Sequence, residues 1–410
     1  MLNKQHCIIS KVQFMTNGLP HQNTAVDTTP HNGPQSYLLI SRMVDFWLLG
    51  GLSIALWIPV YFLQDQLSLA KSLTMAIPGI SLTLAYWVNY PHFMASYKLA
   101  YTQGKGFVVQ NWFQLLLVPI ALILLIAISF GFWNSSISDS SLVHIANTSF
   151  SWLGLKTRLG QYPNLGSEIM GLMIVFLYFT VGWHYSKQTF GCMMVYAKLD
   201  NYRLNTLERN TIRYALLSTW WVSWLYSNCA EGTYPFYGLN IHRLNLPYVW
   251  FQASYFIVST LFIAVAVIFF IKYYRDKQSP SWNFLVPMLA LLIWHIPIMG
   301  NPQFFYLLAF FHSLQYFPFV AKVEKTRYRV NHRPKQTVRL LAFFAIMMLL
   351  GYLSFDLAPH QLDQSLQSRN LFNVSFFMIA FLSFINIHHY FIDNVLWRFK
   401  SKDVKQLLFD

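Results

Sequence analysis

Apolar stretches alternate with short polar ones along most of this chain. A stretch of about 20 residues, at 1.5 Å of rise per residue, forms a helix long enough to cross a hydrocarbon core of roughly 30 Å. The pattern therefore predicts an all-α fold, a polytopic integral membrane bundle of about ten transmembrane helices. The expected spans are residues 44–63, 73–98, 112–133, 167–187, 212–229, 248–272, 283–300, 302–322, 338–355 and 372–397.

Polar sequence flanks this predicted membrane domain at both ends. Residues 1–40 are rich in Asn, Gln, Thr and Pro and contain no apolar run of signal-peptide length, so we expect a disordered tail. We expect residues 41–400 to form a single transmembrane helical domain, followed by a cytoplasmic tail at 401–410. The Gly-Asn-Pro sequence at 300–302 favours a tight turn between two spans.

Composition and charge support the same class of protein. Apolar residues make up 55% of the chain and charged residues only 11%, far below the roughly 25% typical of soluble domains. The net charge of +14 does not indicate a nucleic-acid partner, because Lys and Arg are concentrated in short segments between alternate spans. The positive-inside rule then places both termini in the cytoplasm. We expect a multi-pass protein of a bacterial inner membrane, in contact with membrane lipids.

Five histidines occur in four of the predicted spans at nearly the same depth. His92 and His184 lie about six and three residues from the inner ends of their spans, and His312, His388 and His389 about ten residues from theirs. At about 1.5 Å per residue, each lies roughly 5–15 Å from the cytoplasmic boundary. An ionisable side chain inside a membrane usually faces a partner or a wet cavity, so this set is a candidate functional site.

The chemistry of imidazole indicates a metal centre. Neutral imidazole binds iron, copper and zinc, and helix bundles hold metals with inward-facing side chains from several helices. Carboxylates at this depth are few, and the nearest in sequence is Asp393, one helical turn beyond His389. A shell rich in His and poor in carboxylates favours a single non-haem iron as Fe2+, with a second metal left open. The alternative is structural, in which each ring is hydrogen-bonded to a backbone carbonyl or a nearby tyrosine.

The histidine segments resemble those of the Brp/Blh family of membrane β-carotene dioxygenases. That family has a "PH" helix, an isolated His, an "FIHSxxH" helix and a last helix of the form "PHxxxxD". The matching stretches in this chain are "YPHF" at His92, "WHYSKQ" at His184, "FFHSLQY" at His312 and "IHHYFID" at His388. The resemblance implies that these four histidines ligate a non-haem iron that reacts with O2. It covers four short motifs, and this chain is longer than the family's members.

The adjacent pair at 388 and 389 poses a choice between two ligands. Residues next to each other in a helix point about 100° apart, so both rings do not face one metal equally. The family motif favours His388, whereas Asp393 lies on the same face as His389 and can hold the second ring nitrogen of that histidine. We expect His388 to be the ligand. His389 would then serve a second metal, or replace the second histidine of the family's "FIHSxxH" helix, where this chain has Tyr316. Around the ligands we place Asp393, Tyr316 and Gln188.

The sequence thus favours a membrane-embedded non-haem iron oxygenase or oxidoreductase. Its expected partners are O2 and a hydrophobic substrate, carotenoid-like or lipid, that enters from the bilayer. Aromatic residues near the histidines can stack on such a substrate, namely Trp87, Trp183, Phe310, Phe311 and Phe391. Two other classes stay open. A metal-free membrane acyltransferase would use His312 as a general base, and an ion- or proton-coupled transporter would use the histidines as a relay.

Overall fold

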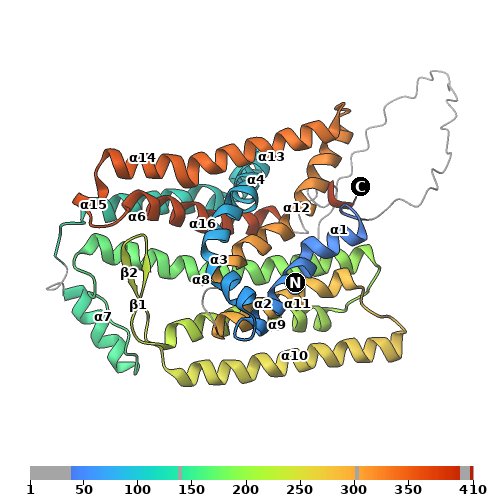
Figure 1. The fold of residues 1–410 in the computed structure, drawn as a ribbon, viewed down its shortest axis with the longest axis horizontal. Helices are drawn as coiled ribbons and strands as arrows, with labels where there is room; N and C mark the ends of the chain where they lie inside the picture. Colours follow the sequence, from blue (N-terminus) through green and yellow to red (C-terminus); the bar gives the residue numbers. More distant parts are fainter. Residues whose placement is uncertain (1–37, 137–140, 301–303, 398–406, 410) are drawn as a thin grey trace, which may run out of the picture. The chain divides into compact units, whose positions relative to one another are not determined.

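The helices of this chain follow the predicted apolar stretches closely (Figure 1). The computed structural model describes residues 38–136, 141–300, 304–397 and 407–409. Most of the expected N-terminal and C-terminal tails, and all but the first residue of the turn expected at 300–302, lie outside these ranges.

Seven helical segments in the described ranges are long and apolar enough to cross a membrane, which confirms an all-α chain of the multi-pass type. They are Arg42–Leu63 (α1 and α2), Ser68–Tyr101 (α3 and α4), Phe113–Gly131 (α6 with a preceding turn), Leu165–Leu199 (α8), Tyr248–Asp276 (α10), Gln336–Ser365 (α13 and α14) and Phe376–Leu396 (α16).

The other three expected spans are also helical but do not reach the same apolar length. They form α9 (Thr206–Cys229), α11 (Trp282–Gly300) and α12 (Phe305–Val330). Charged residues crowd the start of α9 and the end of α12, which lowers their mean hydropathy. In α11 the side chains are described only as far as His295, so the apolar stretch counted there is Trp282–His295. The figure of ten spans is therefore not confirmed.

Several of the long segments are interrupted by short π-helical turns. These turns are Trp47–Gly51, Ala85–Asn89, Phe113–Leu117 and Leu353–Leu357. They separate α1 (Arg42–Phe46) from α2 (Leu52–Leu63), α3 (Ser68–Leu84) from α4 (Tyr90–Tyr101), and α13 (Gln336–Tyr352) from α14 (Ala358–Ser365), and one precedes α6 (Val118–Gly131). Such turns accommodate one residue more than an α-helix and are frequent at functional sites. The remaining short helices are α5 (Lys105–Gln110) and α15 (Ser368–Leu371).

The segments expected to be outer loops contain structure that the apolar pattern does not predict. The segment at 134–166 contains α7 (Ser141–Trp152), and the next one contains an antiparallel hairpin of β1 (Thr233–Phe236) and β2 (Leu239–His242). Tyr237 and Gly238 both have positive φ at the hairpin turn, as the twist of a tight hairpin requires. The side chains of Leu239 and Ile241 are buried and join the core.

Helices α8 and α16 form the interior, and α10 lies at the periphery. In their apolar stretches, 56% of the residues of α8 and 61% of those of α16 are buried, against 6% in α10. Helix α8 packs against α6, α9, α11 and α16, whereas α10 packs mainly against α9 (Figure 1). The outward faces of α10 are therefore exposed in this chain.

A buried ion-pair network joins α4 to α12. Glu324 is fully buried, and its Oε1 atom lies 2.7 Å from Lys98 Nζ and 2.6 Å from Arg327 Nη1. Because a buried carboxylate is tolerated only with such partners, this network fixes the two helices relative to each other. Both helices carry candidate metal ligands.

Candidate metal centre

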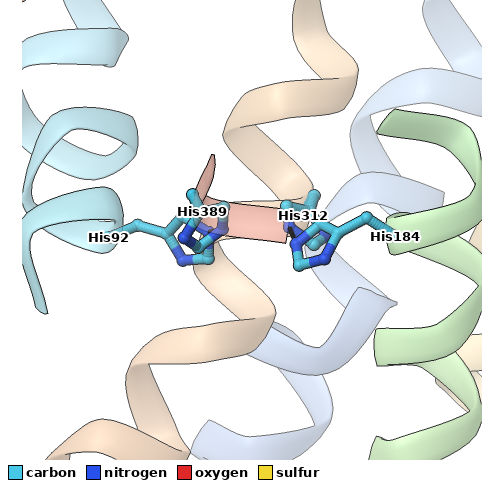
Figure 2. Close-up of side chains that lie close together, drawn as sticks. All are labelled: His92, His184, His312 and His389. Carbon is cyan, nitrogen blue, oxygen red and sulfur yellow. Dashed lines mark hydrogen bonds between the residues drawn. The ribbon is translucent and has the colours of Figure 1, made fainter. Parts of the chain in front are cut away.

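Four histidines from four helices meet in the interior. His92 comes from α4, His184 from α8, His312 from α12 and His389 from α16, and their rings point toward one another (Figure 2). One ring nitrogen from each lies within 4.8 Å of the others. The closest pairs are the Nε2 atoms of His92 and His389 at 2.9 Å and those of His184 and His312 at 3.0 Å. The sequence predicted that His92, His184 and His312 would meet, together with one or both of His388 and His389.

The four imidazole rings are buried. The exposed fractions of His92 and His389 are 0%, and those of His184 and His312 are 4% and 3%. The Nδ1 atoms of His92, His312 and His389 make no hydrogen bond within the described residues. These rings are therefore not held by the backbone carbonyl or tyrosine hydroxyl that usually accounts for a structural histidine, and they contact chiefly one another.

Hydrogen bonds around His312 fix the position of α12. Gln188 Nε2 donates to the His312 carbonyl at 2.8 Å, and Ser313 Oγ donates to Asn89 Oδ1, also at 2.8 Å. Gln315 Nε2 donates to the Leu49 carbonyl at 2.7 Å. Asn89 and Leu49 both belong to π-helical turns. Gln188 was expected near the ligands, whereas Ser313 and Gln315 were missed, although both lie in the quoted segment around His312.

His388, the expected ligand, does not join the four-histidine group, whereas its neighbour His389 does. Its Nδ1 atom is 2.9 Å from the Tyr97 hydroxyl, and its Nε2 atom is 3.5 Å from the Tyr101 hydroxyl. Helical geometry gives the reason, since a ring 100° around α16 from His389 must face another neighbour, here the tyrosine face of α4. His389 occupies the place that was assigned to His388.

Asp393 faces the group but not in the expected way. Its Oδ2 atom lies 3.6 Å from His389 Nε2 and 3.8 Å from His184 Nε2. These are the nitrogens that point to the middle of the group, whereas the expected contact was with the second ring nitrogen of His389. The i,i+4 spacing put the carboxylate on the right face of α16, but it could not specify which nitrogen the carboxylate approaches.

Tyrosine and phenylalanine rings line the group. The Tyr316 ring meets His92 edge-on at a centroid distance of 4.3 Å, and its hydroxyl is 2.5 Å from Ser96 Oγ. Phe93 lies 4.5 Å from His389, Tyr185 lies 4.2 Å from His312, and Tyr390 stacks on His184 at 4.7 Å. Tyr316 therefore packs against a histidine of the group in the position where the resembled family has a fifth imidazole.

The aromatic residues expected to contact a substrate are not gathered at the group. Trp87 is 64% exposed and lines a surface groove with a cavity of about 420 Å³ between Ser68–Tyr101 and α13. Phe311 packs on Trp57, and Phe391 contacts Phe113. These residues lie on other faces of their helices, which spacing along the sequence alone did not separate.

His295 lies apart from the group. Its Nδ1 atom is 2.7 Å from Ser223 Oγ, a contact between α11 and α9. It is 7% exposed and thus as buried as the candidate ligands. His295 therefore serves as a natural comparison for them.

No family model matches this chain, and searches of curated proteins and of solved structures find no match either. The resemblance to the Brp/Blh family therefore rests on the four short motifs. What the described residues establish is a buried group of four histidines that could hold a metal ion.

Proposed function

We propose that this chain is a membrane-embedded, histidine-ligated non-haem iron oxygenase or oxidoreductase acting on a hydrophobic substrate, carotenoid-like or lipid. It would work in a bacterial inner membrane with both termini in the cytoplasm. The observation that carries the proposal is the convergence of His92, His184, His312 and His389 from four separate helices. A metal-free structural role would not require all four rings at one point.

The spacing of the ring nitrogens suits a cation. Neutral imidazole nitrogens that face each other without hydrogen repel through their lone pairs, so each close pair needs a proton or a cation between the rings. One metal serves both pairs at once. Metal–nitrogen bonds near 2.0–2.1 Å put ligand nitrogens no more than about 4.2 Å apart, so a contraction of a few tenths of an ångström brings all four into range.

Iron fits this donor set, together with the aromatic lining. Imidazole ligands suit iron, copper, nickel and zinc, and a carboxylate beside them is typical of non-haem iron sites. A ferrous ion held by these residues would supply one-electron and O2 chemistry. Phe93, Tyr185 and Tyr390 pack around the rings and exclude water, which protects a reactive centre from side reactions. One four-histidine group occurs in the described ranges, which favours one metal over two.

The test is the metal content of the detergent-purified protein by mass spectrometry. We expect about one iron per chain in the wild type, near-complete loss in His312→Ala, and retention in His295→Ala, which removes an equally buried histidine outside the group. A well-folded wild-type protein that contains no metal and acquires none from Fe2+ would refute the proposal.

The same preparation separates the other two classes. An acyltransferase with His312 as general base would transfer acyl groups without metal, and a transporter would move its substrate across vesicle membranes without changing it. An oxygenase would incorporate label from ¹⁸O2 into a lipid-soluble product, and His312→Ala would abolish this incorporation.

A further inference from the structure

Asp393 is a buried carboxylate whose neighbours are hydrogen-bond donors and histidine rings. It is 8% exposed, and among the described residues it forms no ion pair with Lys or Arg. Its Oδ1 atom has no hydrogen bond at normal distance, although Ser96, Tyr316 and Trp397 lie beside it. A carboxylate in an apolar interior carries its charge at a high cost unless a cation lies beside it, and the neighbours just named are hydrogen-bond donors, not cations.

The only ring nitrogens within ion-pair distance of this carboxylate, in the described residues, are those that converge in the group. Its Oδ2 atom is 3.6 Å from His389 Nε2 and 3.8 Å from His184 Nε2. A carboxylate that only oriented a metal-bound histidine would accept a hydrogen bond from the ring nitrogen that faces away from the metal, here Nδ1. The carboxylate thus lies on the metal side of the rings.

The positive charge of the proposed metal ion gives a reason for a carboxylate at this position. Four neutral imidazoles would leave a divalent cation with its full charge in an apolar interior, and one carboxylate halves that net charge. Lys187, on α8 one turn after His184, lies near enough to influence both His184 and Asp393, but its ammonium bonds Asn394 and lies over the Trp183 ring.

We infer that Asp393 is an oxygen ligand of the metal, which turns a four-nitrogen site into a five-coordinate site with four nitrogens and one oxygen. The inference rests on the proposed metal centre. Its consequence is metal choice, since imidazoles alone suit zinc and copper as well as iron, whereas a carboxylate favours the harder ferrous ion. Asp393 would thus help to decide which metal the four histidines hold.

The test compares wild type, Asp393→Asn and Asp393→Glu after removal of metal and addition of Fe2+, Zn2+ or Co2+ alone. Asp356→Asn is the matched control, because Asp356 is a carboxylate in the π-helical turn Leu353–Leu357 that interacts with Tyr86 and not with the group. We expect Asp393→Asn to bind Fe2+ with an affinity lower by about tenfold or more, and to lose less affinity for Zn2+. A loss of about tenfold is the smallest usually seen when a residue that contacts the metal ligands is substituted. Its Co2+ visible bands should intensify as coordination falls from five to four.

Two results would overturn the inference, and they are distinguishable. If Asp393→Asn lowers Fe2+ and Zn2+ affinity equally, with the wild-type Co2+ spectrum, Asp393 is a neighbour of the site and the proposed function stands. If the wild type binds none of the three ions, the proposed function fails and this inference with it. Should Asp393→Asn not fold, Asp393→Glu decides, because a ligand oxygen displaced by one methylene must change the Co2+ spectrum and a non-ligand would leave it unchanged.

Discussion

At the scale of single residues, the adjacent histidines of α16 mark where prediction from sequence ends. Depth along the helices selected five histidines, and four of them gather in the structure, because counting along a helix is a reliable measure of position. The choice between His388 and His389 depended on the rotation of α16 about its axis. Neighbours on α4, namely Tyr97 and Tyr101, set where His388 points, and their positions are a matter of tertiary packing.

Substitution of the two neighbours should separate their roles. We expect His389→Ala to lose most of the bound metal, because one of the four converging nitrogens disappears. His388→Ala should keep its metal and lose only the contact with Tyr97. Mass spectrometry of both purified variants measures this, and full metal in His389→Ala with none in His388→Ala would contradict the arrangement.

At the scale of elements, the apolar pattern located helices well and their irregularities poorly. The expected span at 248–272 corresponds to Tyr248–Asp276, because uninterrupted apolar sequence leaves no alternative to a helix in a bilayer. The π-helical turn Ala85–Asn89 and the hairpin Thr233–His242 were not predicted. A π-helical turn depends on one surplus residue and the packing that accommodates it, and the hairpin is too short and mixed to show a clear alternation.

The contact between α6 and α8 should be sensitive to a single methyl group. A Cβ atom at Gly166 would lie 2.2 Å from the Ser129 carbonyl oxygen and 2.7 Å from Trp133 Cα, and these backbone atoms cannot rotate away. Gly166→Ala should therefore reduce the free energy of unfolding by about 1–3 kcal/mol, as overpacking generally does.

The control is Gly79→Ala in α3, where a Cβ atom would meet nothing within 4 Å. This change should be neutral or slightly stabilising, because alanine is the better helix former. Thermal unfolding in detergent measures both variants, and equal stability of the two would show that α6 and α8 approach each other less closely.

At the scale of the whole molecule, contacts between loops group the helix ends into two sets, which coincide with the alternation of charge along the sequence. Segments expected on the cytoplasmic side contact each other: Arg42 pairs with Asp200, and Ser281 donates to the same carboxylate. Segments expected outside do likewise, since the backbone N–H of Ser375 donates to the Tyr237 carbonyl and Thr157 Oγ1 donates to the Leu244 carbonyl. Charge in the sequence could predict these two sets, although it could not predict which members touch.

Reporter fusions test the orientation directly. We expect a reporter at residue 150, in α7, to be active outside the cytoplasm, and one at residue 332, between α12 and α13, to be active inside. A cytoplasmic signal at residue 150 would contradict the topology and with it the depth at which the histidines were placed.

The distribution of the ligands along the chain has a consequence for biosynthesis. His92 and His389 face each other across 297 positions of sequence, and His389 lies on the last long helix of the described residues. At roughly 5–20 residues per second, a ribosome needs about 15–60 s to travel that distance. During this interval His184 and then His312 join His92, and after residue 312 three polar rings lie in the membrane without their fourth partner. All four histidines are available to a metal only after α16 has inserted. A site that contains metal would therefore show that the helices through residue 389 have been synthesised and assembled.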